Sequence, residues 1–527
     1  MGGAAKQRVG GSLLETNKRL SESLLWRLQR NYFERQGIEA WRSGAVPHHI
    51  TSSPFIADAY AKVVMGFLRD WKLDRRAPIY IVELGSGSGR FAYAFLKKFL
   101  TLYSNSVLKE IPVKYVMTDF TKGNLEYWRT HPSLLPFMSE GSLDLACFDL
   151  ERDVRFELLN SGETLSTTTL RNPLIVISNY VFDSTPQDAF LAAEEKLCEI
   201  LVSLRTPEKE SDTDDPEILS RIEISARENP IDEVYYDDPQ WNRILLDYKQ
   251  RFSDTAFLFP TAALHCLKNL HRLSRGRMLL LSGDRGFNHD DALQTVSRIP
   301  AFALHGSFSM MVDYQIIGEY CALLGGQVLH PSRGTRNLNV SAFMFGDLPG
   351  GFSETRQAYV EAIEKFGPDD FFTLKEGIAR IYDAFTLDQI LAFLRLSCWD
   401  YKRFWDCLPG LKQHLPDMTD FQKQQLHETI IETWNCYLPI GEESDLAFEL
   451  GTLLVEMGFY AEALEFLQRS VDLYGIAAGT AYNMSVCYSS LGRTEPALAA
   501  VDQALILDPD FALAQTLLAE LESTVSS

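Results

Sequence analysis

A glycine-rich segment near residue 85 is the strongest candidate for a functional site in the sequence. It reads Glu83-Leu-Gly85-Ser-Gly87-Ser-Gly89 and follows a short apolar run at residues 79–84. Glycines allow a tight turn and a close approach of a ligand to the backbone, and a helix that follows presents free N–H groups to an electron-rich ligand. The spacing predicts a loop that binds a cofactor or nucleotide, with an ordinary glycine-rich turn as the alternative.

Two nucleotide-binding patterns do not fit this segment. The dinucleotide fingerprint requires a third glycine at position 90, where the chain has Arg90. The P-loop requires a Gly-Lys-Ser/Thr sequence, which this loop lacks. What remains is an acidic residue, a leucine and Gly-x-Gly-x-Gly, which resembles the first motif of Rossmann-like S-adenosylmethionine methyltransferases. That resemblance implies S-adenosyl-L-methionine as the cofactor, bound at Glu83, Gly85, Gly87 and Gly89.

Two aspartates stand at the ends of later apolar runs. Asp119 ends the run at residues 113–119 and could accept hydrogen bonds from ribose hydroxyls. Asp149 ends the run at residues 143–149 and could contact an adenine amino group. Ligands of open α/β sheets bind outside the carboxyl ends of the strands, so the series supports cofactor binding by both. Either aspartate alone could instead be a turn residue or a helix cap.

The candidate catalytic residues, Asn179 and Asp183, follow another predicted strand at residues 174–179. In many methyltransferases of this type the same position lines the methyl-transfer channel, and we predict that both residues act there. Loop capping by Asn179 is the alternative. Asp284-Arg-Gly286 ends a further predicted strand at residues 278–281, where a simple turn is also possible.

Taken in order, these segments resemble the MidA-like family of methyltransferases, of the complex I assembly arginine methyltransferase type. The resemblance covers roughly residues 45–346 and implies a Rossmann-like fold, S-adenosylmethionine as cofactor and methyl transfer to a protein, with arginine the expected acceptor. Its motifs correspond to Ile50-Thr-Ser-Ser-Pro54, Glu83 to Gly89, Asn179 to Pro186, Asp284-Arg-Gly286 and Val312-Asp313-Tyr314.

Two positions depart from the family pattern. Tyr180 stands where the family has a glutamate, and Arg285 stands where it has a tyrosine. In arginine methyltransferases a carboxylate normally orients the guanidinium, because the planar fork pairs with an acid through two hydrogen bonds. Asp183 could still serve in that role. A non-catalytic scaffold, and a methyltransferase acting on a small molecule or lipid precursor, are the competing interpretations; residues 302–311 could line such a pocket.

Alternating strand and helix patterns predict an α/β, Rossmann-like doubly wound sheet with a parallel core. Residues 188–276 interrupt the pattern as an insertion with strand-like runs at 199–204 and 218–225, joined by an acidic solvated loop at 206–216. Helices are expected at residues 12–45, 55–71 and 90–103, a polar turn at 47–54, and further strands at 278–282, 328–330 and 340–345.

Beyond residue 350 the pattern is wholly helical, with capping boxes predicted at Thr373, Thr386 and Thr419. Gly458-x-x-x-x-Ala-Leu recurs as Gly492-x-x-x-x-Ala-Leu, an offset of 34 residues that is the tetratricopeptide period. We expect this region to recruit a protein client. The expected domains are N-terminal helices packing on the catalytic domain (1–72), the methyltransferase domain (73–350), a helical region (351–440) and repeats (441–527).

The composition excludes several classes of function. A net charge of −21, from 71 acidic and 50 basic side chains, argues against a nucleic-acid binder and against docking on anionic lipid. No stretch reaches the roughly 18 apolar residues of a membrane span, and the N-terminus lacks a secretory signal, although its basic, acid-free start is compatible with a transit peptide. The eight cysteines show no metal-binding spacing, so we expect no metal site and reduced thiols in a cytoplasmic setting.

Overall fold

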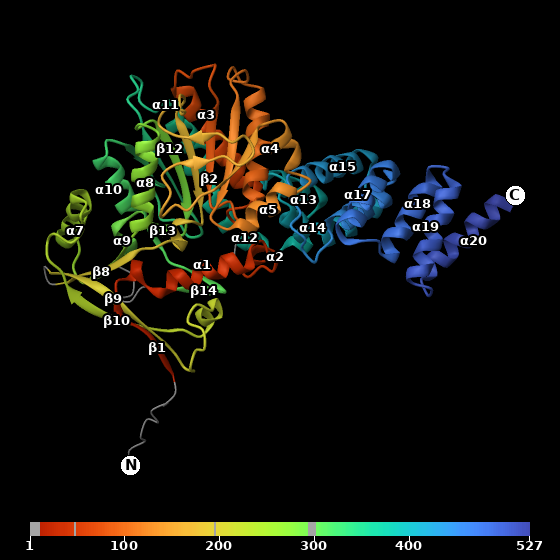
Figure 1. Cartoon of the computed structure of the whole chain (residues 1–527). Helices are drawn as coiled ribbons and strands as arrows, with labels where there is room; N and C mark the ends of the chain where they lie inside the picture. Colours follow the sequence, from red (N-terminus) through yellow and green to blue (C-terminus); the bar gives the residue numbers. More distant parts are fainter. Residues whose placement is uncertain (1–10, 47–48, 194–195, 294–301, 527) are drawn as a thin grey trace, which may run out of the picture. The chain divides into compact units, whose positions relative to one another are not determined.

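The computed structural model describes residues 11–46, 49–193, 196–293 and 302–526 (Figure 1). The chain divides into two compact units, one extending to Lys375 and the other beginning at Glu376. Parts of two predicted features, the acid-free N-terminal start and the polar turn at 47–54, fall at residues 1–10 and 47–48, outside the described residues. No helix within the described ranges has both the length and the apolar character required to cross a membrane.

The first unit is built on a seven-stranded sheet in the order β17-β18-β12-β7-β2-β3-β4. Five neighbouring strands are parallel, β18 runs antiparallel to β12, and β17 runs antiparallel to β18. The chain order reverses between β2 and β7, the switch point at which such sheets bind ligands. The predicted fold class is confirmed. The strands are β2 (Ile79–Leu84), β3 (Val113–Asp119), β4 (Leu143–Cys147), β7 (Leu174–Asn179), β12 (Met278–Asp284), β17 (Gln327–Leu329) and β18 (Asn339–Phe345).

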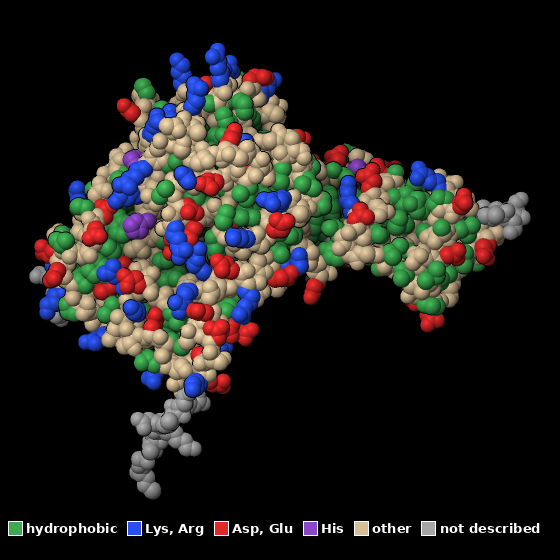
Figure 2. All heavy atoms as spheres, in the orientation of Figure 1, with side chains coloured by type: hydrophobic (Ala, Val, Ile, Leu, Met, Phe, Trp, Pro, Cys, Tyr) green, Lys and Arg blue, Asp and Glu red, His purple; other side chains and the backbone are tan. Residues whose placement is uncertain are grey.

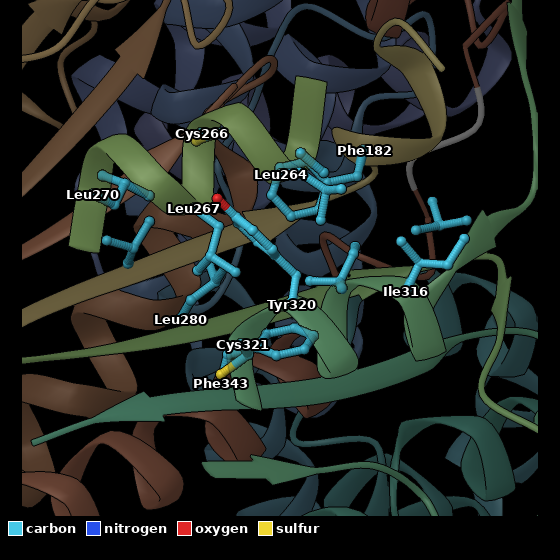
Figure 3. Packing of buried hydrophobic residues seen from close by; sticks show 14 of the residues in the cluster. Phe182, Leu264, Cys266, Leu267, Leu270, Leu280, Ile316, Tyr320, Cys321 and Phe343 are labelled. Carbon is cyan, nitrogen blue, oxygen red and sulfur yellow. The ribbon is translucent and has the colours of Figure 1, made fainter. Parts of the chain in front are cut away.

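Helices cover the sheet because each has a wide apolar face. α3 packs against α4, and α11 packs against α3. Elsewhere α8 and α10 bury residues of one cluster together with β12 and β18, as Figure 3 shows for Leu267, Leu280, Tyr320 and Phe343. Phe182 belongs to the same cluster and anchors the loop after β7. The helices are α3 (Pro54–Asp70), α4 (Arg90–Ser104), α5 (Lys122–Thr130), α6 (Leu135–Ser139), α7 (Pro239–Arg251), α8 (Thr261–Leu273), α9 (Asp290–Leu293), α10 (Tyr314–Leu323), α11 (Ser353–Tyr359) and α12 (Pro368–Ile378).

The insertion supplies β8, β9, β10 and β11 to a second, antiparallel sheet, which β1 from the N-terminal region joins. The sequence predicts only two of these strands. The helix expected from residue 12 is wrong over its first turns, because β1 (Ser12–Lys18) pairs with the distant β9. The strand expected at 218–225 begins later, since residues 216–220 form a 3₁₀ turn. The acidic tract between them is a loop, as predicted. The remaining strands are β8 (Asp188–Ala193), β9 (Lys196–Thr206), β10 (Glu223–Pro230) and β11 (Thr255–Phe259).

Two short helices, α1 (Leu24–Gln36) and α2 (Glu39–Arg42), lie between the two sheets (Figure 1). Leu25 and Leu28 of α1 share a buried cluster with residues of β8 and β9. One face of α1 is therefore fixed to the insertion sheet, and its other side chains remain available to the central sheet. Short strand pairs complete this unit: β5 (Phe156–Glu157), β6 (Thr164–Leu165), β13 (Gly286–Phe287), β14 (Ala303–His305), β15 (Ser307–Ser309) and β16 (Val312–Asp313).

The second unit is all helical. The capping boxes at Thr386 and Thr419 are present. The box predicted at Thr373 is wrong, because α12 begins earlier, at Pro368, and Thr373 lies inside it. Gly458 ends α16 in the left-handed conformation, at φ +88°. The helices are α13 (Leu387–Leu396), α14 (Tyr401–His414), α15 (Asp420–Asn435), α16 (Leu446–Met457), α17 (Tyr460–Tyr474), α18 (Ala478–Ser490), α19 (Thr494–Leu507) and α20 (Ala512–Ser526).

Candidate functional site

A cleft with about 1550 Å³ of empty space, part of it open to solvent, lies at the carboxyl ends of the central strands. It is lined on one side by α1 and α2 and on the other by the segments that follow β2, β3, β4, β7 and β12. Seven of the eight predicted site residues line it: Glu83, Gly85, Gly87, Asp119, Asp149, Asn179 and Asp183. The eighth, Gly89, lies behind the lining and forms the N-cap of α4.

The glycine loop takes a conformation that side chains would disrupt. Gly85, Gly87 and Gly89 have φ values of +59°, +51° and +77°. A Cβ atom on Gly87 would lie 2.7 Å from Cζ2 of Trp41. The indole N–H of Trp128 donates to the carbonyl of Gly87 at 3.2 Å, which fixes the loop, and the Ser88 hydroxyl accepts from the Arg90 N–H at 3.4 Å where α4 begins. The loop thus leaves a narrow, backbone-lined space suited to a ligand.

Glu83 is the next-to-last residue of β2 and is almost completely buried. The hydroxyl of Ser86 donates to its carboxylate at 2.7 Å. Burial raises the pKa of Glu83 to about 7, although the hydrogen bond from Ser86 favours the ionised form. The hydroxyl of Thr118 donates to the Glu83 carbonyl at 2.7 Å, so a neighbouring strand also fixes the backbone of Glu83.

Asp119 is also buried and already serves the turn after β3. Its carboxylate accepts from the Thr121 N–H at 2.8 Å and from the Asn124 amide at 2.9 Å. Burial raises the pKa of Asp119, and these hydrogen bonds oppose the shift. Because each carboxylate oxygen has a second acceptor site, Asp119 can hold the turn before α5 and still accept a ligand hydroxyl.

Asp149 forms an ion pair that the sequence did not reveal. Its carboxylate lies 2.7 Å from Nη2 of Arg30, and the Arg30 guanidinium lies over the ring of Phe120, 4.4 Å from its centroid. The Glu151 N–H also donates to Asp149. Asp149 therefore lines the cleft with some of its acceptor sites already occupied by Arg30 and Glu151.

α1 contributes residues that sequence reasoning missed. Gln29 is buried; its amide donates to the Ser184 carbonyl at 2.9 Å and accepts from the Phe308 N–H at 3.0 Å. Gln29 thereby fastens α1 to the loop after β7 and to β15. The local pattern of α1 gives no signal for these contacts, because both partners are more than 150 residues away. The cleft residues from α1 and α2 are Trp26, Gln29, Arg30, Phe33 and Trp41.

On the side of β7, Asn179 carries an unsatisfied donor. Its Oδ1 accepts from the Tyr60 hydroxyl at 2.8 Å, whereas its Nδ2 is buried and has no partner among the described residues. The next residue, Tyr180, has φ +51°, a strained value for a non-glycine residue. Such a donor beside a cleft is suited to a ligand acceptor atom.

Asp183 is 4% exposed and accepts from the Ser184 hydroxyl at 2.8 Å. Burial raises its pKa to about 6, while Ser184 and the charge of Arg285 lower it. Arg285 lines the cleft with an exposed side chain. Asp284 lies outside the lining: it is fully buried, its carboxylate accepts from the Tyr314 hydroxyl at 3.0 Å, and burial raises its pKa.

Residues 63–320 match the model of a family described as "Putative S-adenosyl-L-methionine-dependent methyltransferase". The chain therefore carries an S-adenosylmethionine-dependent methyltransferase domain. Residues 454–521 match the tetratricopeptide repeat. The predicted S-adenosylmethionine-dependent methyltransferase domain, its cofactor and the C-terminal repeats are confirmed, and neither match indicates the acceptor. The glycine loop, where a Cβ would clash, and the acidic groups around it fit this cofactor.

Two solved structures from Burkholderia thailandensis are similar to this methyltransferase. One, an uncharacterized superfamily protein, has 11% identity, covers 64% of this chain and 94% of its own, and gives a TM-score of 0.37. The other, a superfamily member bound to S-adenosyl-homocysteine, has 13% identity, covers 62% and 94%, and gives a TM-score of 0.36. Similarity at this level adds nothing to the assignment. No curated protein matches the sequence.

Proposed function

We propose that this methyltransferase acts on a protein side chain, with arginine as the acceptor. The observation that carries the proposal is Asp183, a buried carboxylate at the edge of the cleft. A carboxylate in this position can orient a guanidinium through two hydrogen bonds. With a pKa of about 6, Asp183 is mostly ionised at neutral pH and can accept those hydrogen bonds.

The cofactor, when bound, supplies an activated methyl group. We propose that Glu83, Gly85, Gly87, Gly89, Asp119 and Asp149 hold it, the glycines by backbone contact and the carboxylates as acceptors. Asn179 would direct its free amide donor at the ligand, with Tyr60 holding the amide in place. Trp26 and Phe33 of α1 would exclude water from the cleft. Such a reaction depends mainly on orientation, and Asp183 both orients the acceptor and accepts its hydrogen bonds.

We further propose that the repeats at residues 441–527 recruit the client. This segment has 14 acidic and 2 basic side chains, and red side chains outnumber blue ones on the helical part at the right of Figure 2. Such a surface favours a basic client segment. Changing the exposed Glu495, Asp502 and Asp510 to lysine together is expected to reduce client methylation about tenfold while leaving cofactor affinity unchanged.

The free thiols of all eight cysteines fit the reducing cytoplasm, where we propose the enzyme acts.

The decisive experiment uses purified enzyme, heat-inactivated cell lysate and S-adenosylmethionine with a deuterated methyl group. Mass spectrometry is expected to find the label on arginine side chains, and the Asp183→Asn variant is expected to remove it while still binding the cofactor by calorimetry. Label confined to small molecules would replace this proposal with the small-molecule alternative. Cofactor binding with no labelled product would instead favour a scaffold.

A further inference from the structure

The half of the cleft near β7 and β12 contains two residues of opposite charge that differ in burial. Asp183 is buried, and Arg285 is exposed at the end of β12. All three residues Asp183, Tyr180 and Arg285 line the cleft, and the charge of Arg285 opposes the rise in pKa that burial causes at Asp183 and Tyr180. Among the described residues, no carboxylate lies within ion-pair distance of Arg285. Within the part of the chain that the structure describes, Arg285 is therefore a cation without an ion-pair partner.

The backbone around Arg285 is fixed, so the position of this charge is defined. Its carbonyl accepts from the Val312 N–H at 3.0 Å, and the Met310 N–H donates to the Asp183 carbonyl at 2.8 Å. Ser307 and Ser309, which come directly before the segment that makes both bonds, also line the cleft. The same cleft thus contains serine residues and a guanidinium, a chemistry that suits an anionic group.

We propose that Arg285 binds an acidic residue of the client that lies within three residues of the methylated arginine. The inference rests on the proposed function and adds the sequence context of the acceptor. An arginine bound at Asp183 brings a second guanidinium near that of Arg285, and two like charges at this range repel each other. An adjacent aspartate or glutamate on the client removes the repulsion and pairs with Arg285 through two hydrogen bonds. The arginine of the client would then pair with Asp183, and its acidic neighbour would pair with Arg285.

The test reads the residues that surround each labelled arginine. The full-length enzyme is incubated with heat-inactivated lysate and deuterated-methyl S-adenosylmethionine, and mass spectrometry locates the labelled sites. Aspartate and glutamate within three residues are expected at about three times their frequency around unlabelled arginines of the same proteins, as a charge-assisted contact would select. The Arg285→Glu variant is expected to reverse this preference, so that lysine and arginine flank its labelled sites.

Synthetic peptides from the labelled sites give the quantitative measurement. Replacing the flanking glutamate by glutamine is expected to raise KM about tenfold for the wild-type enzyme, which is the scale of a hydrogen bond to a charged group, and to have little effect on Arg285→Glu. Arg243→Glu changes an exposed charge on α7, outside the cleft lining, and should behave as wild type. If Arg285→Glu does not fold, Arg285→Gln should abolish the preference without reversing it.

The possible failures are distinguishable. Labelled arginines with unbiased flanking residues, or an Arg285→Glu variant with the wild-type preference, would overturn the role of Arg285 and leave protein methylation intact. No labelled protein from an enzyme that binds the cofactor would overturn the proposed function and this inference together.

Discussion

The two halves of the cleft, one formed by the segments after β2, β3 and β4 and the other by those after β7 and β12, differ in how neighbouring residues hold the groups that we assign to the ligands. In the β2–β4 half, Glu83, Asp119 and Asp149 each accept a hydrogen bond or ion pair from a neighbouring residue. In the β7–β12 half, the Asn179 amide nitrogen has no partner among the described residues, and Arg285 has no ion pair there. The carboxylates of the first half are therefore held in place, whereas the second half leaves an amide donor and a guanidinium to a ligand.

This difference matches the demands that the two ligands make. A cofactor is the same in every turnover, so a rigid site whose carboxylates are held in place lowers the cost of ordering. An acceptor side chain belongs to a client that must enter and leave, and polar groups that only the correct client satisfies provide discrimination. The proposed roles of the two halves therefore make different predictions for mutation and pH.

The largest effect is expected from Gly87→Asp in the β2–β4 half. The new side chain would meet Trp41 at 2.7 Å and would impose φ +51° on a residue that disfavours it. Calorimetry should show cofactor affinity reduced at least about 100-fold, because the backbone can no longer approach the ligand. Gly141→Asp is the matched control, since Gly141 also has φ +78° but nothing within 4 Å of its Cβ. Equal losses in both variants would show that backbone strain, and not the cleft, causes the defect.

Asp183→Asn should separate the halves most clearly. The amide keeps the shape of the carboxylate but loses its charge, so methyl transfer should fall about 100-fold while the cofactor Kd changes less than about threefold. In the wild-type enzyme, kcat should rise with pH through about 6, because ionisation of Asp183 is required. The residual rate of Asp183→Asn should lack that rise. An equal loss of cofactor affinity would show that Asp183 binds the cofactor and would contradict its role toward the acceptor.

Local signals explain what the sequence could predict. The strands of the central sheet are short apolar runs between turns, and the glycine loop is continuous in the chain, so both could be located without a structure. Gln29 and Arg30 could not, because their partners lie far away in sequence and only the packed fold brings them together. β1 was misread as helix for the same reason, since its pairing with β9 is non-local. Thr373 matched a capping pattern, but Pro368 starts that helix earlier.

Glu83 predicts a pH dependence of stability. Its pKa in the folded protein is about 7 and thus above the value for an exposed glutamate, so the stabilising contribution is present at low pH and lost as pH rises from about 4.5 to 7. Glu83→Gln should remove up to about 3 kcal/mol of that loss, seen as a smaller drop in melting temperature between pH 5 and pH 8. Glu163→Gln is the control, because the Lys114 hydrogen bond lowers the pKa of Glu163 and the group stays ionised in this range. An unchanged drop in Glu83→Gln would mean that Glu83 is ionised throughout.

Asp149→Asn should give the smallest effect, and it tests whether the β2–β4 half extends to α1. If Asp149 only contacts the adenine end, its loss removes one hydrogen bond, worth about 1 kcal/mol, and the cofactor Kd should rise about fivefold. The same change frees Arg30, which is held over Phe120 and pairs with Asp149 at 2.7 Å. Arg30→Gln separates these contributions, since it breaks the ion pair but keeps the Asp149 carboxylate. If Arg30→Gln weakens binding as much as Asp149→Asn does, the ion pair that positions α1 matters more than the carboxylate, and the preorganisation of the β2–β4 half extends to the helix that covers it.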